Sequence, residues 1–389
     1  MSMILDEHRQ YLSDEVRVGL YRKAISKVIK PGDVVVDLGC GTGIFGLMAC
    51  QAGAARVYAI EAGSIIDLAR DIAEANGFAD RIVHVHGLSG RISLPERADV
   101  MVADQAGHFG FEAGLLKYFR DGAKRLLKSG GTAIPSRLEQ WIAPVSYPEA
   151  YRNVEFWNSR PIGLNFVPAG IVAHNTGYPA DFFKARFLGR PVRLSSIDTL
   201  DPPRTLKASI SLSITSPGLL HGFCGYFTAQ LAPGIVMTNS PFVRSPINRR
   251  RVFFPVQQAV RVVPGDKMTV AMNIRFDETL VFWRVQVLGR DGTLKLNSNN
   301  STMQGMMMAL ADLRKIRPDF APALTPWGTA RKTVINLFDG VRTLAQIERE
   351  VFNRHRELFP SAADAALFVA EVVVPYGDDA KPESSASRS

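Results

Sequence analysis

The sequence has few cysteines and lacks any long apolar run. Only three cysteines occur among 389 residues, Cys40, Cys50 and Cys224, and their spacing is not that of a metal site, so we expect no bound metal. We expect Cys40 and Cys50 to be small buried thiols in a reducing compartment. No apolar run approaches the ~20 residues that a membrane helix needs, and the first residues lack the basic end and apolar core of a signal peptide. These absences disfavour a membrane or secreted protein and favour a cytoplasmic one.

Acidic residues are fewer than basic ones, 37 against 46, which gives a formal net charge of +9. Such a surplus favours an acidic partner, either nucleic acid or an acidic peptide. Its densest cluster is Arg249, Arg250 and Arg251, flanked by Arg244 and Arg261. Two interpretations of this cluster stay open, a solvated surface of a barrel strand or loop and a peptide-binding surface.

The most informative segment runs from Val34 to Glu61. A short apolar run at 34–36 predicts a buried parallel strand, and the glycine-rich turn at 39–43 leads into an amphipathic helix. A second strand at 56–60 ends at the carboxylate of Glu61, at the edge of the sheet where open α/β folds bind ligands. Glycines let backbone N–H groups approach a ligand, and the acid can accept both hydroxyls of a ribose. The segment therefore predicts a nucleoside site.

Two parts of this segment resemble motifs of class I S-adenosylmethionine methyltransferases. D-L-G-C-G-T-G at 37–43 is similar to motif I, and A-I-E at 59–61 is similar to post-motif I. The resemblance implies S-adenosylmethionine as the cofactor, and the carboxylate of Asp37 would face this cationic ligand better than a phosphate. The donor-binding residues implied here are Asp37, Gly39, Cys40, Gly41, Thr42, Gly43, Glu61 and Ala62. The alternative is a glycine-rich turn of another Rossmann-like enzyme.

The N-terminal segment 6–29 is predicted to be one helix with an apolar face made by Val16, Leu20, Ala24 and Val28. Its pattern H-x-x-x-L-x-D-E-V-R-x-x-x-Y resembles the helix that precedes motif I in protein arginine methyltransferases. In that family the arginine matching Arg17 holds the carboxylate of the methyl donor, and the histidine matching His8 lies near the substrate pocket. The resemblance therefore adds both residues to the expected cofactor-binding site. The alternative for Arg17 is an exposed helix residue.

The strand expected at 82–86 is followed by G-L-S-G-R-I. Members of that family usually place a glutamate after this strand, where it accepts a hydrogen bond from the adenine amino group. Ser89 or Gly90 takes this position here, so we expect Ser89 or backbone groups to recognise adenine.

A loop at 104–112 follows a buried strand at 100–102. Protein arginine methyltransferases carry two glutamates in the matching loop, which clamp the planar guanidinium of the substrate. The resemblance assigns these catalytic roles to Asp104 and Glu112, although Asp104 is one methylene shorter than glutamate and the loop is one residue shorter. Another acceptor is therefore also considered, for which His108 would be a general base toward a hydroxyl, carboxamide or imidazole. The alternative for His108 is a polar loop residue without a chemical role.

Alternating strands with Pro and Gly turns replace the helical pattern from about residue 138. Their even spacing predicts a sandwich or barrel. The order of a Rossmann-like domain at 1–135 and a β-barrel domain at 136–300 again resembles the arginine methyltransferases. The resemblance places a dimerisation arm at 153–190 and allows a homodimer. The family's Thr-His-Trp loop is replaced by I-N-R at 247–249, so its His to Asp pairing is lost.

The last part of the chain departs from that family. A linker is expected at 301–326, and residues 327–376 carry the signals of three helices, including a capping box from Thr343 to Gln346. L-F-D-G-V-R-T-L-A-Q-I-E-R-E-V resembles the helical half of PqqD-like peptide-recognition domains, which implies a precursor peptide as a partner. The alternative is a helical cap that finishes the barrel. The polar tail at 377–389 is expected to be disordered.

We therefore expect an α/β plus β fold, with a Rossmann-like methyltransferase domain, a β-barrel domain and a small helical C-terminal module. The expected function is methyl transfer from S-adenosylmethionine to a peptide or protein side chain, with arginine as the leading acceptor. Alternatives are another residue of a ribosomal natural-product peptide, a small molecule, or a non-catalytic scaffold. Nucleic-acid methylation is disfavoured, because residues 103–107 lack the N-P-P-Y type of motif used on flipped bases.

Overall fold

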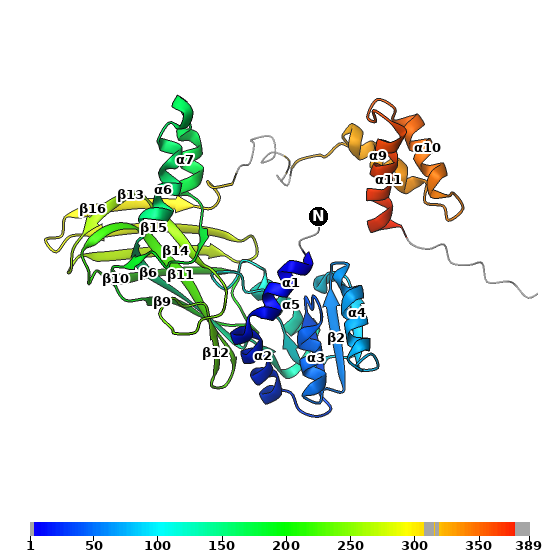
Figure 1. Ribbon diagram of the computed structural model, residues 1–389, viewed down its shortest axis with the longest axis horizontal. Coiled ribbons are helices and arrows are strands. Elements are labelled where there is room, and N and C mark those ends of the chain that lie inside the picture. Colours follow the sequence, from blue (N-terminus) through cyan, green and yellow to red (C-terminus); the bar gives the residue numbers. More distant parts are fainter. Residues whose placement is uncertain (1–3, 307–314, 316–318, 378–389) are drawn as a thin grey trace, which may run out of the picture. The chain divides into compact units, whose positions relative to one another are not determined.

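The computed structural model describes residues 4–306, 315 and 319–377. The chain separates into two compact units, Met1–Met307 and Met308–Ser389. The first unit combines an α/β part with a β part, and the described residues of the second form helices (Figure 1). The expected order of a Rossmann-like part, an antiparallel β part and C-terminal helices is therefore confirmed. None of the helices formed by the described residues is long and apolar enough to cross a membrane.

A five-stranded parallel sheet forms the centre of the α/β part. Its strands are β1 (Val34–Leu38), β2 (Arg56–Glu61), β3 (Ile82–His86), β4 (Ala98–Val102) and β5 (Leu127–Ile134). Their order is β3-β2-β1-β4-β5, and every residue of β1 is buried, as expected of a central parallel strand. The strand order reverses between β1 and β4. The carboxyl ends of these two strands therefore face the crevice where such sheets bind ligands.

The helices of this part begin with a break that the sequence did not predict. They are α1 (Ile4–Ser13), α2 (Glu15–Val28), α3 (Ile44–Gln51), α4 (Ile65–Ala75) and α5 (Leu115–Arg125). The prediction of one helix at 6–29 is wrong, because the chain breaks at Asp14. The Asp14 carboxylate caps α2 by accepting a hydrogen bond from the backbone N–H of Arg17 at 3.1 Å. The predicted apolar face is also wrong at Val16, which is exposed, since the buried residues of α2 are Arg17, Tyr21, Ala24 and Ile25.

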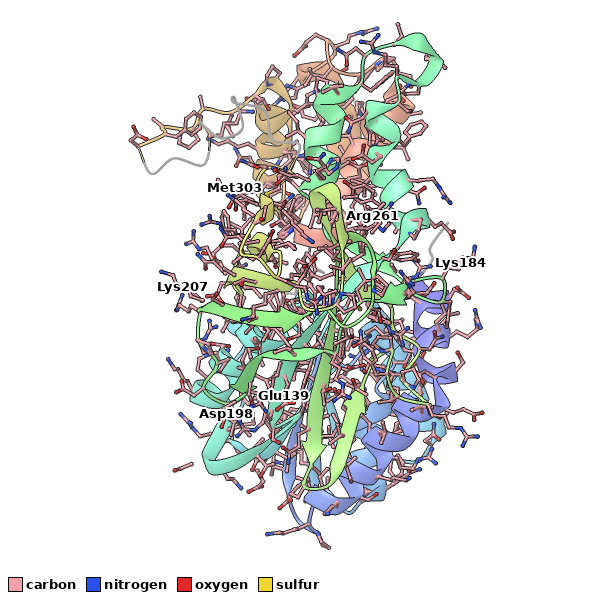
Figure 2. The ribbon with its side chains drawn as sticks, turned by 90° about the vertical axis from the view of Figure 1, so that its left-hand side faces the viewer. Glu139, Lys184, Asp198, Lys207, Arg261 and Met303 are labelled. Carbon is pink, nitrogen blue, oxygen red and sulfur yellow. The ribbon has the colours of Figure 1, made fainter. Side chains whose placement is uncertain are left out.

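Two antiparallel sheets form the β part. The strands are β6 (Arg137–Ser146), β7 (Tyr178–Ala180), β8 (Arg186–Phe187), β9 (Val192–Asp198), β10 (Thr205–Ser213), β11 (Gly218–Ala232), β12 (Ile235–Thr238), β13 (Arg251–Val262), β14 (Lys267–Arg275), β15 (Leu280–Leu288) and β16 (Leu294–Ser301). One sheet has the order β10-β14-β15-β16, and the other has the order β7-β13-β11-β6-β8, with β9 paired to β6 and β12 to β11. Figure 2 labels one residue from a strand of each sheet, Lys207 on β10 and Glu139 on β6. Burial alternates along β14, so one face packs into the core and the other stays accessible.

A helical arm interrupts the β part between β6 and β7. It consists of α6 (Pro148–Glu155) and α7 (Val167–His174), which project from the sheets (Figure 1). His174 Nε2 and Glu155 Oε1 are 2.8 Å apart, a contact that fastens the two helices together. This arm overlaps the predicted dimerisation segment at 153–190, and its apolar side chains Ile162, Leu164 and Ile171 are more than half exposed.

The described part of the second unit is built from three helices. These are α9 (Pro326–Asn336), α10 (Leu344–Arg354) and α11 (Ala362–Tyr376). The capping box predicted from Thr343 to Gln346 is confirmed. Residues 319–377 contain no strand, so the sheet edge that a PqqD-like domain offers its peptide is not found there. Most of the predicted tail, 378–389, and residues 307–314 and 316–318 of the predicted linker lie outside the described residues.

Candidate active site

The glycine-rich turn after β1 forms an open cradle at the edge of the sheet. Gly39, Gly41 and Gly43 have φ angles of +65°, +54° and +81°, a region that favours glycine. A Cβ atom on Gly41 would lie 2.4 Å from Cε1 of His8, and one on Gly39 would lie 2.0 Å from Nε2 of Gln105. The turn therefore depends on glycine both for its backbone conformation and for the space above it.

Glu61 ties the end of β2 to this turn. One carboxylate oxygen accepts the backbone N–H of Gly41 at 3.1 Å, and the other accepts the N–H of Gly63 at 2.9 Å. The acid thus lies at the predicted place beside the glycine turn. Its two oxygens still have free lone pairs, because each carboxylate oxygen can accept more than one hydrogen bond.

Two adjoining cavities share Gly39 and Gln105, and most of the predicted site residues line one or the other. The smaller one, about 270 Å³, lies at the end of β2, and its lining includes the predicted residues Glu61, Ala62 and Ser89. The larger one, about 430 Å³, extends toward the loop after β4. Its lining includes the predicted residues His8, Arg17, Cys40, Gly41, Thr42, Asp104, His108 and Glu112. Asp37 and Gly43 line neither cavity.

Asp37 lies beneath the turn instead of facing the ligand space. Its side chain is fully buried, and Oδ2 accepts the backbone N–H of Gly46 in α3 at 3.0 Å. Oδ1 has no hydrogen-bond partner among the described residues. Burial raises the pKa of Asp37 to about 7. In the structure this carboxyl therefore fixes the start of α3 against β1, which differs from the direct ligand contact expected from the sequence.

Arg17 and Asp104 form a buried ion pair at the centre of the larger cavity. Nε of Arg17 donates to Oδ2 of Asp104, and both side chains are 7% exposed. The hydroxyl of Tyr21 donates to Oδ1 of Asp104 at 3.3 Å, and the ring of Tyr11 lies 5.1 Å from Cζ of Arg17. The alternative of an exposed helix residue at Arg17 is therefore wrong. The guanidinium of Arg17, on α2, is therefore a positive charge held at a fixed position in the site.

Arg249 is a second cation on the same carboxylate. Its Nη2 lies 3.3 Å from Oδ2 of Asp104, and its side chain is only 10% exposed. Burial alone would raise the pKa of Asp104, but the two arginines outweigh burial and lower this pKa below its usual value. Asp104 is therefore ionised and shared between two guanidinium groups.

Glu112 is held by the backbone of its own loop. Its carboxylate accepts hydrogen bonds from the N–H of Phe109 at 2.9 Å and from the N–H of Phe111 at 3.2 Å. Gly107, with a φ of +70°, lets the loop fold closely around this group, since a Cβ there would lie 2.5 Å from Oε2. Burial raises the pKa of Glu112, and the N–H donors offset only part of that effect. The loop brings both predicted acids to one cavity.

His108 also lines this cavity, and burial lowers its pKa, so the ring is neutral near pH 7. Nδ1 lies 3.2 Å from the carbonyl oxygen of Arg250. A carbonyl oxygen only accepts hydrogen bonds, so Nδ1 carries the proton and Nε2 has a lone pair. The ring therefore has the tautomer that a general base requires.

The segment 247–249 that replaces the Thr-His-Trp loop is still fastened to the N-terminal helices. The backbone N–H of Asn248 donates to Oδ2 of Asp14 at 2.7 Å. The interpretation of the arginine cluster as a solvated surface is wrong for Arg249 and Arg251, which are buried. Arg250, with 61% of its side chain exposed, and the flanking Arg244 and Arg261 do extend into solvent.

Three residues of the site were missed from the sequence: Tyr11, Gln105 and Arg249. Gln105 follows Asp104 directly, and its Nε2 donates to the carbonyl of Leu38 at 2.7 Å, which lays the amide across the glycine turn. Its position next to a predicted acid was the only available signal. Arg249 belongs to the segment 247–249, which the family resemblance places where the Thr-His-Trp loop packs against the active site, but its ion pair with Asp104 was not predicted.

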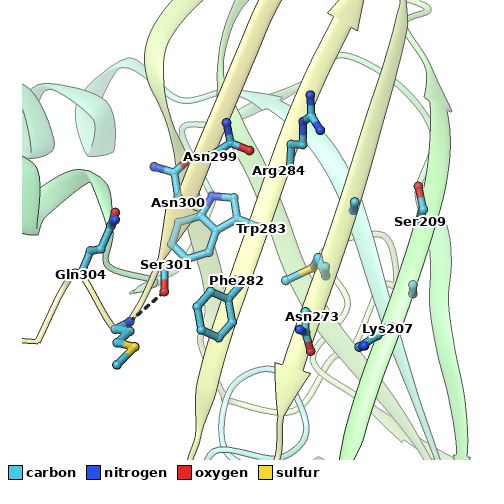
Figure 3. A pocket seen from close by; sticks show the side chains of 14 residues that line it. Lys207, Ser209, Asn273, Phe282, Trp283, Arg284, Asn299, Asn300, Ser301 and Gln304 are labelled. Carbon is cyan, nitrogen blue, oxygen red and sulfur yellow. Dashed lines mark hydrogen bonds between the residues drawn. The ribbon is translucent and has the colours of Figure 1, made fainter.

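A separate hollow of about 690 Å³ lies over the four-stranded sheet (Figure 3). Phe282, Trp283 and Asn273 line it, together with Lys207 and Ser209 of β10. Its described lining contains neither a carboxylate nor a histidine, and no predicted site residue. The acid and base groups of the site therefore belong to the cavities at the glycine turn.

Comparisons with known proteins agree with this geometry. Residues 20–140 match the family model described as ribosomal protein L11 methyltransferase. Over 277 residues the chain is 29% identical to protein arginine N-methyltransferase 6 of Danio rerio, covering 67% of this chain and 79% of that protein. It is 35% identical over 155 residues to probable protein arginine N-methyltransferase 6 of Arabidopsis thaliana, covering 39% of this chain and only 36% of that protein.

Two solved structures share the fold of the first unit. Protein arginine methyltransferase 10 of Arabidopsis thaliana superposes with a TM-score of 0.67 at 22% identity, covering 77% of this chain and 98% of that one. The PRMT1 enzyme-prozyme complex of Trypanosoma brucei with AdoHcy gives a TM-score of 0.68 at 18% identity, covering 76% of this chain and 97% of that one.

The residues present fit S-adenosylmethionine. The glycine turn leaves a cradle that a Cβ would fill, and Oε1 of Gln105 above it is buried without a partner among the described residues. Glu61 and Arg17 supply the acid and the cation that the ribose and the methionine carboxylate of this donor require. Site, sequence and fold together identify the chain as an S-adenosylmethionine-dependent methyltransferase that resembles the protein arginine methyltransferases.

Proposed function

We propose that the enzyme methylates an arginine side chain of a peptide or protein. The observation that carries this proposal is the presence of two carboxylates with little access to solvent, Asp104 and Glu112, in the cavity that Arg17 also lines. A planar guanidinium binds best to carboxylates that accept its N–H groups in parallel pairs. The named functions of the relatives from Danio rerio and Arabidopsis thaliana support the same acceptor.

The residues of the chain divide into two groups by role. Glu61, Ala62, Ser89 and the glycine turn would hold the nucleoside, and Arg17 the carboxylate of the donor, with His8 packed on Gly41. S-adenosylmethionine supplies an activated methyl group on a sulfonium. Asp104 and Glu112 would bind the acceptor cation and fix one of its nitrogens in place, so that most of the rate enhancement comes from orientation and electrostatics.

The test is mass spectrometry of a peptide with a single arginine after incubation with the full chain and S-adenosylmethionine. A matched peptide carries lysine at the same position. The expected result is a mass gain of one CH2 unit that fragmentation assigns to the arginine, and no gain on the lysine peptide. Methylation of another residue in both peptides would overturn the proposed acceptor.

A second acceptor class has one specific observation in its favour. His108 is neutral and presents a lone pair on Nε2 in the same cavity, which suits removal of a proton from a hydroxyl, carboxamide or imidazole. Fragmentation in the same experiment separates the two proposals, because methylation would then map to serine, asparagine or histidine. Loss of that methylation in His108→Gln, with donor affinity unchanged, would support this alternative.

We infer that the arm at 153–190 joins two copies of the chain. Ile162, Leu164 and Ile171 expose apolar surface on it, with Phe156 and Val167 nearby in the sequence and about half exposed. Apolar side chains clustered on a projecting element favour a protein interface. A homodimer in solution is the simplest assembly that would cover them.

The C-terminal helices are proposed to recruit the peptide substrate, including a precursor peptide encoded for modification. Val341, Leu367 and Val374 expose apolar surface on or beside α10 and α11. Because residues 319–377 contain no strand, the peptide would bind along the helices rather than add to a sheet edge. Val341→Asp in the full chain is expected to raise KM for the recruited peptide without changing kcat.

A reducing compartment such as the cytoplasm is proposed as the place where the enzyme works. Cys40, Cys50 and Cys224 are all unpaired and buried. Unpaired thiols persist where the cell keeps cysteines reduced.

A further inference from the structure

Arg249 lies between two cavities and lines both of them. On one side lies the 430 Å³ cavity that contains Asp104 and Glu112. On the other lies a cavity of about 810 Å³, whose charged lining residues are Arg249, Arg250, Arg251, Glu7 and Asp181, so that arginines outnumber carboxylates in it. Arg249, Tyr11 and His108 line both. The Arg249 side chain therefore has access to the outer cavity as well as to Asp104.

The contacts of the Arg249 guanidinium are long. Nη2 lies 3.3 Å from Asp104, Nη1 lies 3.4 Å from the carbonyl oxygen of Gly107, and Cζ lies 5.8 Å from the centre of the Tyr11 ring. The Arg17 contact with the same carboxylate is much shorter. Of the two cations on Asp104, Arg249 is therefore the one that an incoming guanidinium would replace.

The charges of the site do not balance once both substrates are bound. Arg17 and Arg249 match Asp104 and Glu112 in the free enzyme, and Glu61 adds one negative charge at the end of β2. The methyl donor brings two positive groups and one carboxylate, and an acceptor arginine brings one more positive group. The filled site would therefore hold one uncompensated positive charge in a largely enclosed space, where charges interact more strongly than in water. An additional anion next to Arg249 would balance this charge.

We propose, on the basis of the arginine acceptor above, that Arg249 selects acceptor arginines that have a carboxylate as a neighbour. The acceptor guanidinium takes the face of Asp104 that Arg249 covers, and Arg249 turns to the outer cavity to pair with the substrate carboxylate. Two acids without Arg249 beside them would instead favour cationic segments rich in glycine and arginine. Arg250 also lines the outer cavity, but its side chain is 61% exposed and lies 3.8 Å from Asp181, which already pairs with it.

The experiment compares two peptides that carry one arginine flanked by either aspartate or asparagine. For the full-length enzyme we expect KM to be about tenfold lower with the aspartate peptide, which corresponds to about 1.4 kcal/mol. In Arg249→Met the preference should fall to less than about twofold, and in the control Arg250→Met most of it should remain. Arg249→Lys keeps the charge without the planar fork and should retain an intermediate preference.

Peptide binding in the presence of S-adenosylhomocysteine, followed by fluorescence anisotropy, separates the failure of this inference from the failure of the proposed function. If arginine is not methylated but the enzyme still binds the aspartate peptide more tightly through Arg249, the acceptor assignment is wrong and the recognition by Arg249 stands. The inference is overturned if the unmodified enzyme binds both peptides equally. It is also overturned if Arg249→Met binds S-adenosylhomocysteine normally and keeps the full preference.

Discussion

Asp14 connects α2 to the loop at 247–249, and its replacement by alanine makes a quantitative test of the structure. One oxygen caps α2 through the N–H of Arg17 at 3.1 Å, and the other holds the N–H of Asn248 at 2.7 Å. Loss of a side-chain cap costs about 1 kcal/mol, and loss of a buried hydrogen bond to a charged acceptor costs about 1.5–3 kcal/mol. We expect Asp14→Ala to lower the free energy of unfolding of the first unit by roughly 2.5–4 kcal/mol.

Urea unfolding of the full chain measures this change, because three of its four tryptophans, Trp141, Trp157 and Trp283, lie in the first unit. The control is Ser64→Ala, at a helix N-cap whose side chain makes no cap hydrogen bond, and it should stay within about 0.5 kcal/mol of the unchanged protein. Asp14→Ala should also weaken donor binding, since Arg17 lies in the first turn of α2. Equal stability of the two variants would refute the claim that Asp14 fastens the loop at 247–249 to the helix.

Three further predictions concern the turn, the buried acid and the arm. Gly41→Ala should weaken S-adenosylhomocysteine binding at least about tenfold by calorimetry. The control is Gly77→Ala, because Gly77 also has a positive φ but open space around it. Both variants carry a backbone strain of about 1 kcal/mol, but Gly77→Ala should bind normally. The folded chain keeps the Asp37 proton up to a pKa of about 7, while an unfolded chain releases it near 3.8, so stability from this group is present below pH 4 and lost as pH rises toward 7. The free energy of unfolding of the unchanged protein should therefore fall by on the order of 3–4 kcal/mol, relative to that of Asp37→Asn, between pH 4 and pH 7. A constant difference between the two proteins would contradict the buried, unpartnered oxygen. Ile171→Asp should convert a dimer to a monomer in light scattering, and an unchanged mass would exclude the arm as the interface.

The parts of the site that the sequence predicted are those coded within one short segment. Gly39 and Gly41 sit between a strand and a helix, and Glu61 ends the next strand, so local periodicity and turn chemistry were enough to place them. Asp37 belongs to the same segment but was predicted to face the ligand, because a motif gives the position of a carboxylate and not the direction in which it points. Its hydrogen bond to Gly46 decides that direction.

The parts that were missed include one local signal and several contacts between distant segments. The break at Asp14 is marked locally, because aspartate is a preferred N-cap residue and its carboxylate accepts the N–H of Arg17, but the helical periodicity alone predicted a continuous helix. The second contact of Asp14, with Asn248, spans 234 residues, and no pattern within 6–29 contains it. Arg249 was recognised as part of a basic cluster, but its burial against Asp104 is a consequence of how the β part packs on α2.

Replacement of Glu112 by glutamine tests the central claim most directly. The claim is that this carboxylate positions the acceptor and does not bind the donor. Glu112→Gln keeps the shape but removes the negative charge, so kcat on an arginine peptide should fall at least about a hundredfold. The Kd of S-adenosylhomocysteine should stay within about threefold, and Glu96→Gln, at an exposed ion pair with Arg56, should change neither quantity. Persistent turnover, or an equal loss of turnover and donor affinity, would contradict the account.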